Sequence, residues 1–272
     1  MMSLFGKVKD ELQEKIFNKR YKHNWWTKTV WMKLNNNDDS LIYEAIELVR
    51  NNVSKYVYSK ETNSYESWKI RKVTEISKER NIAINKGQYL EEALERIFVA
   101  SIDDLYNQFN LLSGVLEQPQ TRKSIDIVAV ENNSIKEMIE LKEWENKNDS
   151  PILSALELLL DYFVYNKLII DKVRSKNRTP PDVCKNLKLS VLAPIDYYEY
   201  YGNFEAITLI TNAANRYLSE HQSGNFEFSF DQLSGKFGKR KIIQSIPEGD
   251  LKALPKDIKS EIKRWFYERK KL

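Results

Sequence analysis

Hydrophobic and polar residues alternate along two short stretches near the middle of the chain. Residues 124–130 alternate and then become continuously apolar and rich in β-branched side chains, which is typical of a strand with at least one buried face. Residues 131–134 are polar and predict a turn, and residues 138–142 alternate again. The pattern therefore predicts a hairpin of two strands.

Three charged residues lie on this hairpin. Because side chains point to alternate faces of a strand, Glu140 and Lys142 are expected on one face. Ile139 and Leu141 then point into a core on the opposite face. Asp126 lies on the first strand, so the hairpin brings an Asp, a Glu and a Lys to one surface of the sheet.

Further elements surround the hairpin. Helices are predicted over 88–101, 152–170 and 204–219, where apolar residues recur at helical spacing or dominate the stretch. Strands are predicted over 109–117 and 187–194. The expected fold class is α/β or α+β, with a mixed central sheet flanked by helices.

The pattern divides the chain into three regions. Residues 1–85 are expected to form a helical N-terminal region with helices over 41–57 and 65–81. Residues 86–220 hold the hairpin and its surrounding elements, and residues 221–272 form a basic C-terminal extension. The middle region is therefore the predicted core.

The C-terminal extension shows two patterns and one basic cluster. Residues 225–230 alternate like an edge strand, and a final helix is predicted from Lys256 to the end. The basic residues of this helix outnumber its acids, which is typical of a solvated helix face. Lys239 and Arg240 lie in a basic cluster beside two glycines, which predicts either a phosphate contact or an exposed turn.

Basic and aromatic residues are interleaved over residues 15–34, which hold six Lys or Arg, three Trp and no Asp or Glu. A nucleic-acid groove uses cations for phosphates and rings for stacking on bases, so Lys28 and Trp25 are predicted to bind nucleic acid. Tryptophans in a short helical region also form its core, and this alternative stays open. Arg122 and Lys123 precede the first strand of the hairpin and are assigned either to a phosphate contact or to a surface turn.

Composition narrows the class of protein. The chain has 272 residues, a net charge of +4, one cysteine and two histidines. One cysteine excludes an intrachain disulfide and fits a reducing cytoplasm, and two histidines exclude metal sites built from several histidines. The chain contains no Gly-x-x-x-x-Gly-Lys-Ser/Thr sequence and no apolar run near the roughly 18 residues that cross a bilayer. A soluble cytoplasmic protein without ATP-driven activity is expected.

Asp126 and Glu140 together predict a site for a hard cation. Two carboxylates that converge from neighbouring strands suit Mg²⁺ or Mn²⁺, which prefer oxygen ligands. A lysine repels a metal ion, so Lys142 is expected to act on the substrate side. It would hold or deprotonate an attacking water, or neutralise charge on a phosphate.

The order Ile125-Asp126, a spacing of 14 positions, and Glu140-Leu141-Lys142 resembles the active-site signature of the PD-(D/E)XK nuclease superfamily, which has the restriction-endonuclease-like fold. The core of that superfamily is a helix, three strands that bear the motif, a helix and a fourth strand, and the predicted elements follow this order. The resemblance implies a DNA nuclease that binds Mg²⁺ through Asp126, Glu140 and the Leu141 carbonyl and leaves a 5′-phosphate. No Gln occurs over residues 144–170, where some exonucleases of the superfamily carry one, so an endonuclease is favoured.

The helix before the hairpin supplies a further acid. On a helical wheel, Glu91 lies at the margin of the apolar stripe, Glu95 lies farther round, and Glu92 lies nearly opposite. A Lys-Gly pair precedes Glu91 at the interval seen before a catalytic Glu in Holliday-junction resolvases, which this short stretch resembles. Glu91 is therefore expected to complete the metal shell. The alternative reading is a solvated helix position.

The sequence thus predicts an Mg²⁺- or Mn²⁺-dependent nuclease that acts on DNA, with Glu91, Asp126, Glu140 and Lys142 as its catalytic residues. A homodimer is compatible with this prediction, because cutting both strands of a duplex needs two sites. Two alternatives stay open. The chain is a non-catalytic nucleic-acid-binding or protein-interaction module that retains the nuclease fold, or the motif is an accidental set of surface charges.

Overall fold

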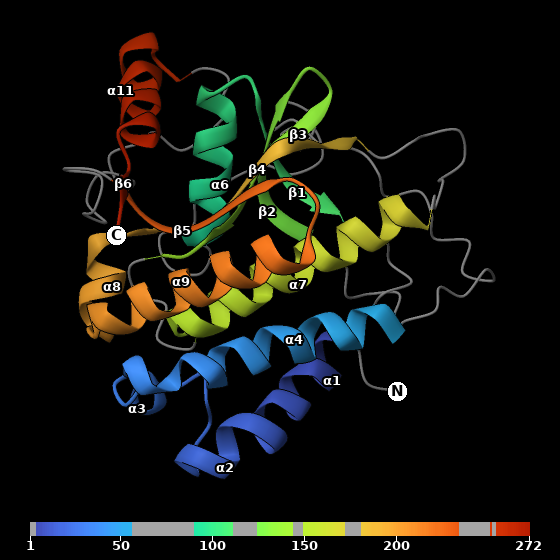
Figure 1. Cartoon of the computed structure of the whole chain (residues 1–272). Helices are drawn as coiled ribbons and strands as arrows, with labels where there is room; N and C mark the ends of the chain where they lie inside the picture. The colour runs from blue at the N-terminus through green and yellow to red at the C-terminus, as the bar shows by residue number, and fades with distance from the viewer. Residues whose placement is uncertain are drawn as a thin grey trace.

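The computed structural model describes residues 4–55, 90–110, 124–143, 149–171, 181–233, 251 and 254–272. Within them, the centre is a six-stranded mixed sheet with the order β1-β2-β3-β4-β5-β6. The strands are β1 (Leu105–Asn110), β2 (Ser124–Glu131), β3 (Ser134–Leu141), β4 (Asp182–Pro194), β5 (Asn225–Leu233) and β6 (Lys270–Lys271). Helices flank this sheet (Figure 1), so the predicted mixed α/β class is confirmed.

The first three strands form an antiparallel meander, and β4 and β5 then run parallel to β3. The predicted hairpin is β2–β3, whose ladder pairs Ile127 with Ile139. Asn132 and Asn133 form its turn with φ values of 49° and 62°. Asn adopts this left-handed conformation more readily than most residues, which explains why the polar turn lies there.

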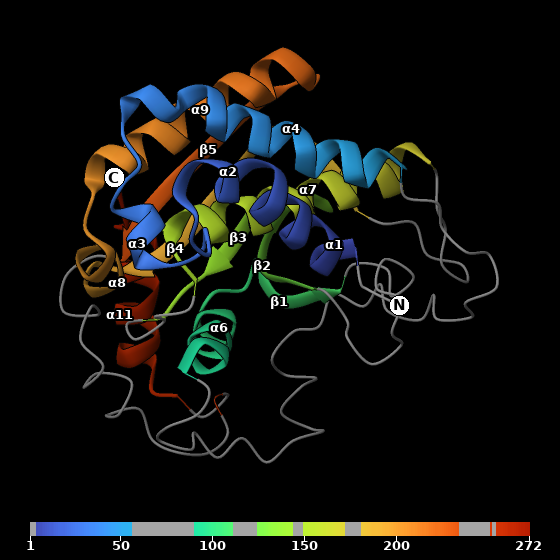
Figure 2. The same ribbon diagram turned by 90° about the horizontal axis from the view of Figure 1, so that it is seen from below.

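Helices cover the two faces of the sheet as separate layers (Figures 1 and 2). One face carries α6 (Leu90–Ser101) and α11 (Lys256–Tyr267), and the other carries α7 (Pro151–Ile170) and α9 (Phe204–His221). A further helix, α4 (Asp39–Lys55), packs on α7 and α9. Each face of the sheet therefore has its own apolar core.

The helix α7 is apolar nearly all round because it is buried on both sides. It lies between the sheet and α4, and a helix with apolar residues on every side is expected in such a position. It begins at Pro151 after Ser150, one residue before the predicted start at 152. Proline is tolerated there because an N–H at the first helical position has no helical partner. Within this buried helix, the Glu157 carboxylate lies 3.7 Å from Lys142 Nζ, directly after β3.

The remaining described N-terminal elements are α1 (Leu4–Glu11), η1 (Leu12–Phe17), α2 (Asn18–Tyr21), α3 (Lys28–Trp31) and η2 (Asn36–Asp38). Their apolar residues belong to the same core as α7. The Trp31 Nε1 donates to the Gly202 carbonyl at 2.7 Å, and Asn203 Nδ2 donates to the carbonyls of Trp31 and Leu34 at 2.7 and 2.9 Å. These bonds anchor α3 beside the end of α8 (Ile195–Tyr201).

Some boundaries differ from the sequence prediction. β1 begins at residue 105 rather than 109, and residues 111–117 lie outside the described residues. β4 begins at residue 182 rather than 187, and its first five residues are partly or fully exposed. The predicted helix over 65–81 also lies outside the described residues.

The C-terminal elements join the central sheet. β5 is not an edge strand along its full length, because β6 pairs with its Asp231 and Gln232. The last helix ends at Tyr267 rather than at the chain end, and the Leu272 N–H then donates to the Phe230 carbonyl at 2.9 Å. The pattern of basic residues after Tyr267 gave no sign of this short strand.

Candidate active site

Neighbouring strands bring Asp126 and Glu140 together. Continuing the register of Ile127 and Ile139 by one residue places Asp126 opposite Glu140. The Leu141 N–H donates to Asp126 Oδ2 at 2.8 Å. Because the N–H and C=O of one strand residue point to the same side, the Leu141 carbonyl is also directed toward the Asp126 strand. The structure therefore places the three predicted oxygen donors at one point of the β2–β3 pair.

Lys142 follows directly after β3 and is buried, with 3% of its surface exposed. Its Nζ lies 2.7 Å from Glu140 Oε1, 3.7 Å from Glu157 Oε2 and 3.9 Å from Glu91 Oε1. These carboxylates come from β3, α7 and α6, respectively. We refer to Lys142, Glu140, Glu157 and Glu91 as the Lys142 cluster.

The ammonium of Lys142 keeps its proton. Burial alone lowers the pKa of a lysine, but Glu140, Glu91 and nearby carboxylates outweigh burial and raise the pKa of Lys142 above its usual value. A lysine in this state cannot take a proton from water near neutral pH. The geometry therefore suits a fixed positive charge and hydrogen-bond donor, and it disfavours the predicted alternative in which Lys142 deprotonates water.

Glu91 lies in the first turn of α6 and titrates near neutral pH. Burial raises its pKa to about 7, and Lys142 opposes this rise. The negative charges of Glu140, Asp149 and Glu143 raise the pKa further. Burial is therefore the main reason that this carboxyl group holds its proton near neutral pH.

The other acids of α6 have different surroundings. Glu92 forms an ion pair with Arg96 one turn later. Glu95 is only 3% exposed, although the helical wheel places it away from the apolar stripe. The helix α11 packs against α6, an interaction that the wheel of one helix cannot indicate.

The donor set fits a divalent cation in its chemistry. In the described part of the chain, the Lys142 cluster has three carboxylates and one ammonium, and Asp126 adds a further carboxylate beside it. Hard oxygen donors with an excess of negative charge favour Mg²⁺ or Mn²⁺. No group of three Asp, Glu, His or Cys side chains among the described residues is arranged to hold a metal ion. The fit therefore depends on Asp126, Glu140 and the Leu141 carbonyl.

Glu157 is the site residue that the sequence pattern does not reveal. It interrupts an apolar helix and is buried, so its carboxylate lies against Lys142 rather than in solvent. A single acid within a buried apolar helix is a weak signal, because a surface helix face shows acids too. Its significance follows only from the packing of α7 on β3.

The predicted nucleic-acid contacts differ in outcome. Trp25 is fully buried, and its ring stacks on Phe17 at 5.0 Å, so it belongs to the core and cannot stack on a base. Lys28 is exposed, with its Nζ 4.3 Å from the ring centre of Tyr200. Four further predicted contacts lie outside the described residues: Arg122, Lys123, Lys239 and Arg240.

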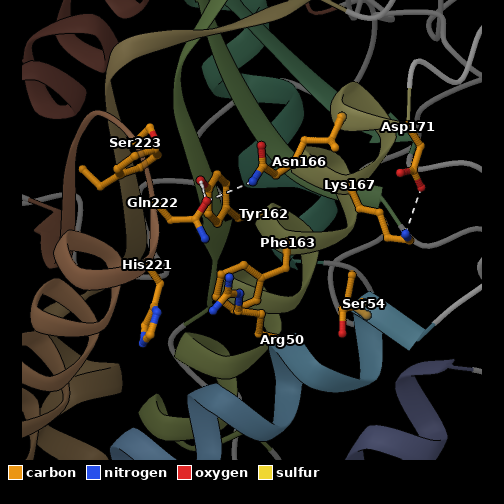
Figure 3. A pocket seen from close by; sticks show the side chains of 13 residues that line it. Arg50, Ser54, Tyr162, Phe163, Asn166, Lys167, Asp171, His221, Gln222 and Ser223 are labelled. Carbon is orange, nitrogen blue, oxygen red and sulfur yellow. Dashed lines mark hydrogen bonds and ion pairs between the residues drawn. The ribbon is translucent and has the colours of Figure 1, made fainter.

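A cavity of about 520 Å³ lies at the opposite end of α7 (Figure 3). Tyr162 Oη and Asn166 Nδ2 both donate to Gln222 Oε1 on its wall, at 3.1 and 3.0 Å. The carboxylate on its lining, Asp171, is paired with Lys167 at 2.9 Å. The cavity therefore has a different character from the acidic Lys142 cluster.

In the part of the chain that the structure describes, no helix has the length and apolar character needed to cross a membrane. The carboxylates around Lys142 are the feature of these residues that most constrains function. Comparisons of the chain with protein-family models, with curated proteins and with solved structures found no match.

Proposed function

We propose that this chain is a metal-dependent nuclease that hydrolyses phosphodiester bonds of DNA, with a restriction-endonuclease-like core. The observation that carries the proposal is the buried Lys142 ammonium, which lies within 4 Å of Glu140, Glu157 and Glu91 beside Asp126. The element order adds support, because α6 precedes the meander β1–β3 and α7 and β4 follow it.

Asp126, Glu140 and the Leu141 carbonyl would hold Mg²⁺ or Mn²⁺. When bound, such an ion polarises the phosphate and makes water a better nucleophile. Asp126 keeps its orientation through the Leu141 N–H, and Glu140 keeps its orientation through Lys142. The protein thus orients both carboxylates before any substrate arrives.

Lys142 and Glu91 would have separate roles in the attack of water on the phosphate. Lys142 stays protonated, so it donates a hydrogen bond to the attacking water or to a phosphate oxygen. Glu91, with a pKa of about 7, is suited to accept the proton of that water. The bond from water oxygen to phosphorus forms as the bond to the 3′ oxygen breaks, the leaving oxygen is protonated by solvent, and a 5′-phosphate results.

One observation favours a second function, a nucleic-acid-binding or protein-interaction module without turnover. Lys142 Nζ lies 2.7 Å from Glu140 Oε1, an oxygen that a metal ion would also use. An ammonium and a divalent cation compete for the same carboxylate. A site in which this ion pair persists would bind DNA or another partner without cutting DNA.

Cleavage assays decide between the two functions. Linear, circular and branched DNA is incubated with wild type and Lys142→Ala, with and without Mg²⁺ or Mn²⁺. Lys136→Ala is the matched control, because Lys136 lies on the same strand but pairs with Asp104 at 2.8 Å outside the cluster. Metal-dependent cutting that Lys142→Ala loses and Lys136→Ala keeps supports the nuclease. Binding without cutting by wild type supports the module.

A further inference from the structure

The cavity at the C-terminal half of α7 is separate from the Lys142 cluster. Its volume is about 520 Å³, and it lies between α4, α7 and the segment that leads from α9 into β5 (Figure 3). Asn166 on its wall lies nine positions after Glu157 of the Lys142 cluster, which is roughly 14 Å along the helix axis. Small-molecule sites have volumes of about 300–1,000 Å³. The cavity is therefore large enough for a ligand of its own.

Arg50 brings a positive charge to this cavity. It lies on α4 and is partly buried, and no carboxylate of the described residues forms an ion pair with it. It interacts with the Tyr217 hydroxyl, which needs only one of the five N–H donors of a guanidinium. The guanidinium keeps its charge at physiological pH. Several of its donors therefore stay available to an anion.

Gln222 directs the two N–H donors of its amide into the same cavity. Tyr162 Oη and Asn166 Nδ2 both donate to its Oε1, at 3.1 and 3.0 Å, and these bonds fix the orientation of the amide. Burial raises the pKa of Tyr162, so its hydroxyl keeps its proton and stays a donor. Figure 3 shows the Gln222 nitrogen pointing away from Asn166 and toward Arg50. Arg50 and Gln222 thus form an end of the cavity that suits an anion.

The rest of the lining combines one ion pair with apolar surface. Asp171 would repel an anion, but it is paired with Lys167 at 2.9 Å, and Figure 3 shows this pair apart from Arg50. Phe226 and Ile170 also line the cavity, and they are partly exposed and 68% exposed, respectively. Covering this apolar surface with a planar ring is favourable.

We propose that this cavity binds a nucleoside monophosphate, with the phosphate at Arg50 and Gln222 and the base against Phe226 and Ile170. A phosphate has three terminal oxygens, which match a planar guanidinium and an amide that donate together. Aromatic side chains stack on any base, because every base has a π-face. The inference goes beyond the proposed nuclease and does not rest on it, because the cavity shares no residue with the Lys142 cluster.

Isothermal titration calorimetry of the metal-free protein without DNA tests the inference with three probes: AMP, adenosine and inorganic phosphate. We expect AMP to bind, and adenosine and phosphate to bind about tenfold more weakly or less, because each lacks one of the two groups. Equal affinities for AMP and inorganic phosphate would overturn the inference, because the ring would then contribute nothing. No binding at about 1 mM AMP would also overturn it.

Arg50→Met and Gln222→Glu test the two anion contacts. The first removes the charge and keeps an unbranched apolar side chain. The second keeps an oxygen that accepts from Tyr162 and replaces the nitrogen with a negative oxygen. Each should weaken AMP binding by about tenfold or more. Arg216→Met is the matched control, because it removes the same charge outside the cavity, where Arg216 pairs with Asp39 at 2.7 Å. An equal loss in this control would mean a general charge effect and would overturn the site.

Two further measurements separate the cavity from the fold and from the nuclease site. Thermal unfolding without AMP verifies that each variant is folded. Arg50→Lys replaces Arg50→Met if the latter is not folded, and weaker AMP binding is still expected because lysine lacks the planar fork. Lys142→Ala should bind AMP as wild type does. A loss of AMP binding in Lys142→Ala would place AMP at the Lys142 cluster and overturn the inference. A wild type that binds AMP but cuts no DNA would support the cavity site and reject the nuclease.

Discussion

Two buried charge clusters share strand β3, and they differ in their balance of charge. The Lys142 cluster has one ammonium among three carboxylates of the described residues. A second cluster, here called the Arg269 cluster, has two cations and two carboxylates: Glu137, Lys188, Asp231 and Arg269. Glu137 and Glu140 lie three residues apart on the same strand, so their side chains point to opposite faces of the sheet.

The hydrogen bonds of the Arg269 cluster are those of a structural element. Arg269 Nη2 donates to both oxygens of Glu137 at 2.6 Å, and its Nε lies 2.9 Å from Asp231 Oδ2. Ser190 Oγ also donates to Glu137, at 2.6 Å. Balanced charges with short bonds hold the C-terminal segment on the sheet. An acid excess, by contrast, destabilises the fold unless a cation binds, and this difference is what supports the proposed function of the Lys142 cluster.

The largest expected effect follows from a substitution that breaks the Arg269 cluster. Arg269→Ala leaves Glu137 and Asp231 with one cation between them, so we expect a loss of about 3–5 kcal/mol in the free energy of unfolding. Urea unfolding measures this loss. The control is Lys271→Ala, because its ion pair with Glu227 is about half exposed on both sides and should contribute less than about 1 kcal/mol. Equal effects of the two variants would contradict the structural role of the Arg269 cluster.

The next largest effect is expected for Asp126, beside the Lys142 cluster. It should change the rate of DNA cleavage rather than the stability of the fold. Asp126→Asn keeps an oxygen that can accept the Leu141 N–H, but it removes the negative charge that binds the cation. Metal-dependent cleavage should fall by roughly 100-fold or more, with little change in Tm. Asp104→Asn is the control, because Asp104 pairs with Lys136 at the other end of β3. A large loss of Tm in Asp126→Asn would instead assign Asp126 a structural role.

The sequence predicts those elements of the site whose apolar residues recur with a regular local period. The β2–β3 hairpin and the helices α6, α7 and α9 follow from apolar spacing, and that spacing brings Asp126, Glu140 and Lys142 together. Glu91 reaches the same cluster because it lies on the margin of the apolar stripe of α6. These residues were predictable because the elements that carry them are adjacent in the chain or strongly amphipathic.

Long-range packing explains what the sequence does not reveal. Glu157 meets Lys142 only after α7 packs on the sheet. Trp25 resembles a stacking platform in sequence but fills the core beside Phe17. Tyr197 on α8 is buried, and its hydroxyl donates to the Asp149 carbonyl, a partner 48 positions away in the chain.

A smaller effect is expected for Glu157, and it tests whether this member of the Lys142 cluster contributes to cleavage. Glu157→Gln keeps the shape of the side chain and removes one of the charges that orient Lys142. We expect cleavage to fall by about tenfold, as outer-shell changes at metal sites do. Single-turnover cleavage at saturating Mg²⁺ measures this change. A variant as active as wild type would restrict the cluster to Glu140 and Glu91.

The smallest effect uses pH and concerns Glu91. Its folded-state pKa of about 7 lies above the ordinary value of 4.5, so the folded protein holds a proton that the unfolded chain has released between these two pH values. The contribution of Glu91 to stability is therefore fully present below pH 4.5 and is lost as the pH rises through 7. Relative to Glu91→Gln, the free energy of unfolding of metal-free wild type should fall by about 1 kcal/mol between pH 5 and 8. This figure is reduced because the Glu91 side chain is 31% exposed.

Urea unfolding of both proteins at the two pH values measures the difference. Saturating Mg²⁺ should abolish it, because a bound cation favours the ionised carboxylate. A difference that persists with Mg²⁺ would mean that the excess negative charge around Lys142 is not matched to a cation.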